Sequence, residues 1–144
     1  MNNLSLTEYR ELAQFRFEIR QFLQFSEQAA RDHGLEPQQH QALLALKGLT
    51  ETTPATIGEL AARLLLKHHS AVGLVDRLEK AGLLAREPSP GDARQVLVRL
   101  TRSGETLLRK LSLAHRQELQ VSGPRLLDSL RTVLDGRSTE AHSA

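Results

Sequence analysis

The sequence has no cysteine and no tryptophan, and aromatic residues make up only 3% of its 144 residues. Without cysteine the chain cannot form disulfides, thiolate metal sites or cysteine-based redox centres. With so few aromatic rings it has little to stack on single-stranded nucleic acid. No apolar run approaches the roughly 20 residues of a membrane span, and the start MNNLSLTEYRE lacks the character of a signal peptide. We therefore expect a cytoplasmic protein with no membrane association.

The positive charge of the chain is concentrated in one region. Residues 56–102 carry eight basic and five acidic side chains, a net charge of +3, whereas the whole chain has a net charge of +2. A local basic excess of this kind indicates nucleic-acid binding, but the excess is small and the signal is weak.

A long amphipathic helix is expected at the start of the chain. Ser5 and Glu8 have the spacing of a capping box, and apolar residues then recur at three- and four-residue steps to about Asp32, where His33-Gly34 ends the helix. Such a helix would be roughly 40 Å long. The rest of so small a chain cannot cover it, so we expect part of it to pack on a partner.

The middle of the chain predicts short helices followed by a hairpin. Pro37 suits the first turn of a second helix, and Thr56 to Glu59 form another capping box. The expected elements are a helix from 37, a linker over 50–54, a helix to about Leu64, a helix from about His69 to Ala81 ended by Gly82, and strands over 83–87 and 95–100 around a loop at 88–94.

A second long helix is expected after the hairpin. Thr101 is expected to cap it, and it should run from Arg102 to about Val121. Ser-Gly-Pro at 122–124 should break it before a last helix over 125–134. The polar residues 136–144 are expected to form a flexible tail.

The helix near 69–81 has two distinct faces. Its apolar residues, Ala71, Leu74, Val75 and Leu78, should point inward, and His69, Ser70, Gly73 and Arg77 should point outward. Gly73 in mid-helix costs roughly 1 kcal/mol relative to alanine, which makes sense where something must approach the backbone closely. Two short helices, a tight connection and a hairpin make a winged helix-turn-helix. Its second helix is narrow enough for the major groove of DNA.

These segments resemble the MarR family of bacterial transcription regulators. The resemblance lies in TIGELAARLLLKHHSAVGLVDRLEKAGLLAREP and in DARQVLVRLT, where Asp-x-Arg is followed by an alternating strand that ends in Leu-Thr. It implies a mainly α fold with a small two-stranded β-wing. It also implies that 1–35 and 102–135 form a helical dimerisation region and that 36–101 form the DNA-binding lobe.

The resemblance also implies roles for individual residues. Arg94 would enter the minor groove while Asp92 braces its guanidinium. Ala93 departs from relatives that carry a second basic residue there, which puts some phosphate contacts in doubt. The full set of expected DNA-binding residues is Thr56, His68, His69, Ser70, Gly73, Arg77, Asp92 and Arg94.

Simpler interpretations of these residues stay open. Asp92 and Arg94 would otherwise be a surface ion pair in a turn, and Arg77 would pair with an acid of its own helix, such as Asp76 or the region of Glu79. Ser70 would merely start a helix, and Thr56 would merely cap one.

Ligand, metal and catalytic sites have weaker signals. Arg16, Phe17 and His40 are candidate contacts for a small, often aromatic and anionic effector of the kind that MarR relatives bind. His68 and His69 are adjacent and point about 100° apart on a helix, so they cannot share one metal ion. We expect no metal, no cofactor and no enzyme activity, because no nucleotide loop, catalytic triad or carboxylate pair is present.

The expected function is therefore that of a homodimeric repressor that binds double-stranded DNA at a pseudo-palindromic operator and is released by a small molecule. Two alternatives stay open. One is a winged-helix protein-interaction adaptor without strong DNA affinity, and the other is a metal-responsive regulator.

Overall fold

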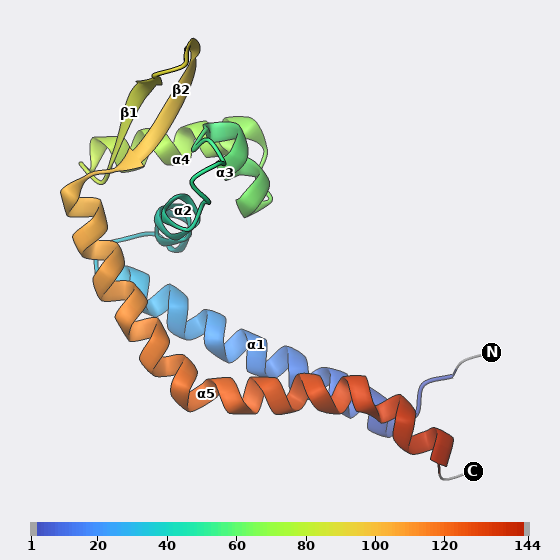
Figure 1. Ribbon diagram of the computed structural model, residues 1–144. Coiled ribbons are helices and arrows are strands. Elements are labelled where there is room, and N and C mark those ends of the chain that lie inside the picture. The colour runs from blue at the N-terminus through green and yellow to red at the C-terminus, as the bar shows by residue number, and fades with distance from the viewer. Residues whose placement is uncertain (1–2, 143–144) are drawn as a thin grey trace. The chain divides into compact units, whose positions relative to one another are not determined.

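The computed structural model describes the backbone of residues 3–142 and the side chains of residues 3–136. Five helices and one two-stranded antiparallel sheet follow each other in these residues (Figure 1). In chain order they are α1 (Leu6–Asp32), α2 (Pro37–Lys47), α3 (Ile57–Leu64), α4 (His68–Lys80), β1 (Leu84–Ser89), β2 (Asp92–Leu100) and α5 (Arg102–His142). The mainly helical fold with a small β-wing is the predicted one.

The chain divides into two compact units. The lobe comprises Ala29–Ser112, and the helical unit comprises α1 as far as Gln28 together with α5 from Leu113. Within the helical unit the two long helices lie side by side (Figure 1). Within residues 3–142, none of the helices combines the length and the apolarity that crossing a membrane requires.

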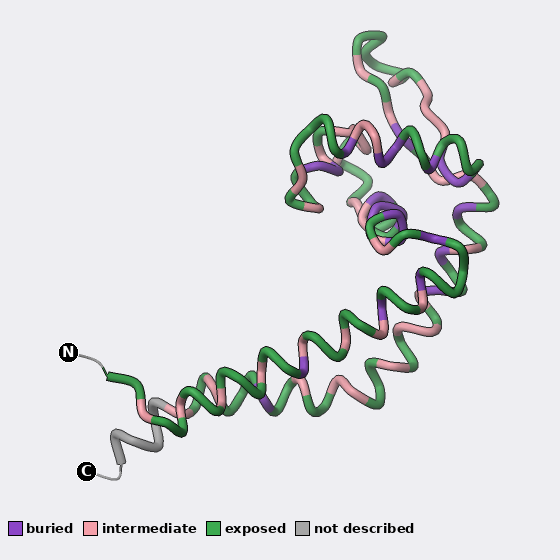
Figure 2. Tube along the Cα trace, turned by 180° about the vertical axis from the view of Figure 1, so that it is seen from behind, coloured by how far each residue is buried: buried purple, intermediate pink, exposed green. Residues whose placement is uncertain are grey.

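The apolar core belongs to the lobe. The inward residues of α4, Ala71, Leu74, Val75 and Leu78, are each 0% exposed, as their spacing predicts. They pack with buried residues of the other lobe elements: Leu43 of α2, Leu60 of α3, Leu84 of β1, Val98 of β2 and Leu111 of α5. Figure 2 shows this concentration of buried residues in purple.

Local hydrogen bonds explain where several elements begin. At α1, Glu8 N–H donates to Ser5 Oγ and Ser5 N–H donates to the Glu8 carboxylate, both at 3.1 Å, so the predicted capping box is complete. At α3, Glu59 N–H donates to Thr56 Oγ1 at 3.1 Å. The return bond of that predicted box is not formed, because the Glu59 carboxylate pairs with Arg63 and Thr56 N–H donates to Pro54.

The strands are longer than predicted. The expected loop over 88–94 is wrong, since β1 continues to Ser89, β2 begins at Asp92, and Pro90-Gly91 alone form the turn. Pro88 is tolerated because each strand of a two-stranded sheet has an edge, where a missing N–H breaks no ladder bond. α4 also starts one residue earlier than expected, at His68.

The predicted break at 122–124 is also wrong. α5 runs without interruption from Arg102 to His142 with Pro124 inside it. A proline within a helix removes one backbone donor and crowds the preceding turn, but neighbouring turns can preserve the helical path. The helix extends into the segment expected to be a tail, and residues 143–144 lie outside the described residues.

Two residues with left-handed backbone allow a matched test of conformational strain. Leu65, in the turn between α3 and α4, has φ 55° and is 92% exposed, whereas Gly82 after α4 has φ 76° and open space where a Cβ would lie. Left-handed backbone costs a non-glycine residue roughly 1–2 kcal/mol. We expect Leu65→Gly to raise the free energy of unfolding by as much as about 1 kcal/mol and Gly82→Ala to lower it by about 1 kcal/mol. Urea denaturation measures both, and a loss of stability in Leu65→Gly would show that this turn is not strained.

Candidate nucleic-acid interface

The outward face of α4 is polar and open to solvent. Burial of the apolar face turns His69, Ser70 and Arg77 outward, and all three are exposed, as is His68 at the start of the helix. No side chain caps the first turn of α4, so N–H groups there are available to an acceptor such as a phosphate. Thr56 lies half-buried at the corresponding end of α3, where its hydroxyl caps the helix. The simple interpretation of Thr56 as a cap is therefore confirmed, and its phosphate contact stays a prediction.

Arg77 has a different ionic partner from the one considered in the sequence. Its Nε lies 3.7 Å from Glu36 Oε2, a residue just before α2, and both side chains are about half exposed or more. Asp76 and Glu79 pair with Arg86 instead, so an ion pair of Arg77 within its own helix is wrong. The sequence does not predict this contact, because Glu36 and Arg77 are far apart along the chain and come together only when the lobe packs. An exposed, long ion pair of this kind contributes little to stability and can be exchanged for another anion.

Gly73 lies on the same side of α4 as Arg77. A Cβ placed on Gly73 would lie 3.4 Å from Arg77 Nη1, an ordinary van der Waals distance. The lobe itself therefore does not require glycine at this position, and close approach of an outside molecule stays the predicted reason for it.

The wing, which we define as the β1–β2 hairpin, contains an irregularity at Arg94. Pro88 pairs with Val96, but the adjacent Ser89 pairs with Asp92, so three residues of β2, Ala93 to Gln95, lie between consecutive paired positions. Bulges of this kind change the direction of a side chain. Arg94 is exposed within this bulge. In the described part of the chain, no acidic side chain lies within ion-pair distance of its guanidinium.

Asp92 therefore acts differently from the predicted brace. Its Oδ1 accepts a hydrogen bond from the backbone N–H of Arg94 at 3.0 Å. The contact lies at the start of the bulge, and such a turn around an Asp side chain is common. The predicted brace of the Arg94 guanidinium is wrong, because Asp92 holds the backbone and leaves the side chain free.

Arg86 was not singled out in the sequence. On β1, its Nη2 lies 2.6 Å from Asp76 Oδ1 and its Nη1 lies 3.0 Å from Glu79 Oε1, both on α4. The hydrogen bond to Asp76 is the largest cause that raises the pKa of Arg86 above its ordinary value, and partial burial opposes it. No spacing rule in the sequence predicts a contact between a strand and a preceding helix, so only the fold reveals it.

The three predicted effector contacts belong to two different units, and their common site stays a prediction. Arg16 and Phe17 are exposed on α1 in the helical unit, whereas His40 is 1% exposed in the lobe. His40 is therefore part of the lobe interior. Among the described residues, no group of three or more His, Cys, Asp or Glu side chains is placed to hold a metal ion.

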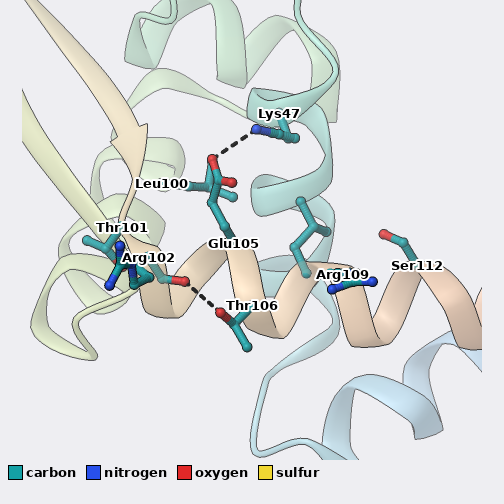
Figure 3. A pocket seen from close by; sticks show the side chains of 9 residues that line it. Lys47, Leu100, Thr101, Arg102, Glu105, Thr106, Arg109 and Ser112 are labelled. Carbon is teal, nitrogen blue, oxygen red and sulfur yellow. Dashed lines mark hydrogen bonds and ion pairs between the residues drawn. The ribbon is translucent and has the colours of Figure 1, made fainter.

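The lobe contains a cavity of about 690 Å³ between the end of α2, the end of β2 and the first turns of α5 (Figure 3). Its charged lining consists of Lys47, Arg102, Glu105 and Arg109, and Lys47 Nζ lies 2.9 Å from Glu105 Oε1. Thr101, Thr106 and Ser112 add hydroxyl groups. Three cations against one carboxylate make the cavity suitable for an anion.

Taken together, α3, the turn at Leu65, α4 and the wing define a winged helix-turn-helix. The sequence profile of the MarR family matches residues 33–95. YkoM of Bacillus subtilis (strain 168), an uncharacterized HTH-type transcriptional regulator, is 34% identical over 109 residues, which cover 74% of this chain and 69% of that protein. The chain belongs to the MarR family of transcription regulators.

Other relatives agree with this assignment. YcgE of the same organism, also an uncharacterized HTH-type transcriptional regulator, is 43% identical over 74 residues. The match covers 51% of this chain and 46% of YcgE, so the chain spans less than half of that relative's length.

Solved structures share the fold at low sequence identity. AbsC, a MarR family transcriptional regulator from Streptomyces coelicolor, has a TM-score of 0.74 at 20% identity and full coverage of both chains. The S. aureus MepR–DNA complex has a TM-score of 0.66 at 18% identity, with 98% of each chain covered. CouR from Rhodococcus jostii RHA1 bound to p-coumaroyl-CoA has a TM-score of 0.61 at 23% identity, covering 78% of this chain and 83% of CouR.

The contact of Asp92 with the backbone predicts how substitutions at this position will rank. Asn keeps an oxygen that can accept from the Arg94 N–H, so Asp92→Asn should retain DNA affinity, whereas Asp92→Ala should weaken it. Arg94→Ala should cost about 1–3 kcal/mol of binding with the melting temperature nearly unchanged. Fluorescence anisotropy with an operator duplex measures the affinities. Equal losses of DNA affinity in Asp92→Asn and Asp92→Ala would contradict this role and favour the predicted brace, in which the charge of Asp92 holds the Arg94 guanidinium.

Proposed function

We propose that this chain is a homodimeric repressor that occupies a pseudo-palindromic operator in double-stranded DNA. α4 would enter the major groove, and Arg94 would enter the adjacent minor groove, where narrow A·T-rich DNA attracts arginine. The observation that carries the proposal is that one lobe of a MarR family protein exposes both the polar face of α4 and an arginine raised on a bulge. The MepR–DNA complex, which shares the fold, supports DNA as the partner.

The composition of the helical unit supports a homodimer. All sixteen buried apolar residues among the described residues lie in the lobe, whereas twelve of the fifteen exposed large apolar side chains lie in the helical unit. Burial of apolar area drives association, and a second copy offers the same surface in a two-fold arrangement. The twelve are Leu4, Leu6, Tyr9, Leu12, Phe17, Leu23, Leu113, Leu119, Val121, Leu127, Leu130 and Leu134. Two-fold symmetry would set the two α4 helices about 34–36 Å apart, one turn of B-DNA.

The cavity at Lys47 supports a small anionic effector. CouR is a relative in fold that was solved with p-coumaroyl-CoA, an anionic aromatic thioester. Here an anion would compete with Glu105 for Lys47, and Arg102 and Arg109 add positive charge to the lining of the cavity. Release of the operator would follow only if the effector binds the DNA-free state more tightly than the DNA-bound state.

DNA binding is tested with duplexes from the intergenic DNA upstream of the chain's own gene. We expect sequence-selective binding that weakens by about 100-fold or more between about 50 and 200 mM salt, because phosphate contacts release counterions. A scrambled duplex of equal length is the control for selectivity. A folded dimer that binds no duplex in a salt-dependent way would contradict the repressor and favour the protein-interaction adaptor.

The effector site is tested with benzoate and other aromatic carboxylates as probes. We expect Arg109→Ala to weaken probe binding by about tenfold, since it removes one charge-assisted hydrogen bond. Lys110→Ala is the matched control, because Lys110 is an exposed cation on the next position of α5 and does not line the cavity. Isothermal titration calorimetry measures both variants, and equal affinity of the two for every probe that binds would contradict this site.

A further inference from the structure

One ionic cluster joins the wing to α4, the helix that we propose enters the major groove. We define the Arg86 cluster as Arg86 of β1 with Asp76 and Glu79 of α4. The guanidinium reaches both carboxylates, at 2.6 and 3.0 Å, and the backbone N–H of Arg86 also donates to Glu79 Oε2 at 3.1 Å. Glu79 thus holds both the main chain and the side chain of Arg86, a more restrictive arrangement than a single surface ion pair.

The wing depends on such contacts because it is a sheet of two strands. A hairpin alone is marginally stable in water and needs packing against another element. β2 is held to the lobe by Val98 N–H, which donates to Ala55 O at 2.8 Å. On β1, Leu84 is buried at the base, and Arg86 follows two residues closer to the tip on its way to Pro90-Gly91. The Arg86 cluster therefore ties β1 to α4 at a position between the base of the wing and its tip.

The cluster also changes the charge that α4 presents. Asp76 and Glu79 flank Arg77 in the sequence and are exposed. Two free carboxylates on a helix that lies in a DNA groove would repel phosphates, since like charges in proximity weaken association. Arg86 sets a cation between them, and its side chain is the least exposed of the three, at 27% against 59% and 43%.

We infer that Arg86 is a positioning residue for operator binding. It fixes the wing relative to α4, so that Arg94 and the helix meet their two grooves together, and its charge offsets part of the negative charge of Asp76 and Glu79. This inference rests on the proposed DNA-binding function.

Arg99 provides a matched control. It lies on the other strand of the same wing and pairs with Glu87 at 2.8 Å, a contact within the hairpin that does not reach α4. Arg86→Gln and Arg99→Gln each remove one positive charge from the wing and leave acidic partners behind. Only the first removes the side-chain ion pairs between the wing and α4.

Operator affinity of the full chain is measured by anisotropy in wild type, Arg86→Gln and Arg99→Gln, each with and without Arg94→Ala. We expect about a twofold loss for Arg99→Gln and a loss of about tenfold or more for Arg86→Gln, because contacts in one network couple strongly. Arg94→Ala should cost much less in the Arg86→Gln background than in wild type. Equal losses in the two single variants, or an undiminished effect of Arg94→Ala, would overturn the inference. Failure of the wild type to bind any duplex would instead overturn the proposed function.

A second measurement requires no DNA. Because the chain has no cysteine, Gly91→Cys and Lys80→Cys place two unique spin labels, one at the tip of the wing and one at the end of α4. We expect Arg86→Gln to broaden the distance distribution between the labels while Arg99→Gln leaves it unchanged. If Arg86→Gln does not fold, Asp76→Asn with Glu79→Gln tests the same tie, and broadening is again expected. Unchanged distributions in the variants that fold would contradict the positioning role.

Discussion

The burial of one face of α4 is the constraint on which the rest of the lobe depends. Ala71, Leu74, Val75 and Leu78 are fully enclosed, and each such side chain contributes hydrophobic free energy in proportion to the area it hides. Because these four positions point inward, the polar residues between them must point outward. The same packing brings Leu84 and Val98 of the wing into the core. The packing that folds the lobe therefore also exposes the polar face of α4.

The two arginines of the wing are held in opposite ways. Arg86 is paired with two carboxylates and lies partly covered, so it acts on the structure of the lobe. Arg94 is raised on a bulge and its backbone alone is held, so its charge stays available to an outside anion. A carboxylate bonded to the Arg94 guanidinium would have offset part of the attraction to phosphate. Holding the main chain instead limits the motion of the residue without neutralising it.

The faces of α4 and the caps at Ser5 and Thr56 follow from the sequence, because they depend on residues three or four positions apart. The hairpin follows from the alternation of apolar residues and from the Pro-Gly turn. The extent of the strands and the continuity of α5 do not follow, since Pro88 lies within β1 and Pro124 lies inside α5, where a rule about proline predicts a loop or a break. The ion pairs of Arg77 and Arg86 join elements separated along the chain. Ion pairs between different elements depend on how those elements pack in three dimensions, and the periodicity of residues along one helix does not predict that packing.

The two units differ in the apolar surface that they bury. In the lobe, apolar side chains from the helices and both strands meet, whereas the described helical unit buries Glu18, Ser26 and Ser129 but no apolar residue fully. Phe22 and Phe25 reach His115 in edge-on contacts with ring centroids 6.0 and 5.4 Å apart, and the His115 ring lies 2.8 Å from Ser26 Oγ. Two helices cannot enclose a core by themselves, since each has only one neighbour to cover its apolar stripe. A second copy would supply the missing layer, and the same two-fold contact would present two copies of α4 to the DNA. In the proposed homodimer, the apolar surface left exposed on α1 and α5 would therefore link assembly to DNA recognition.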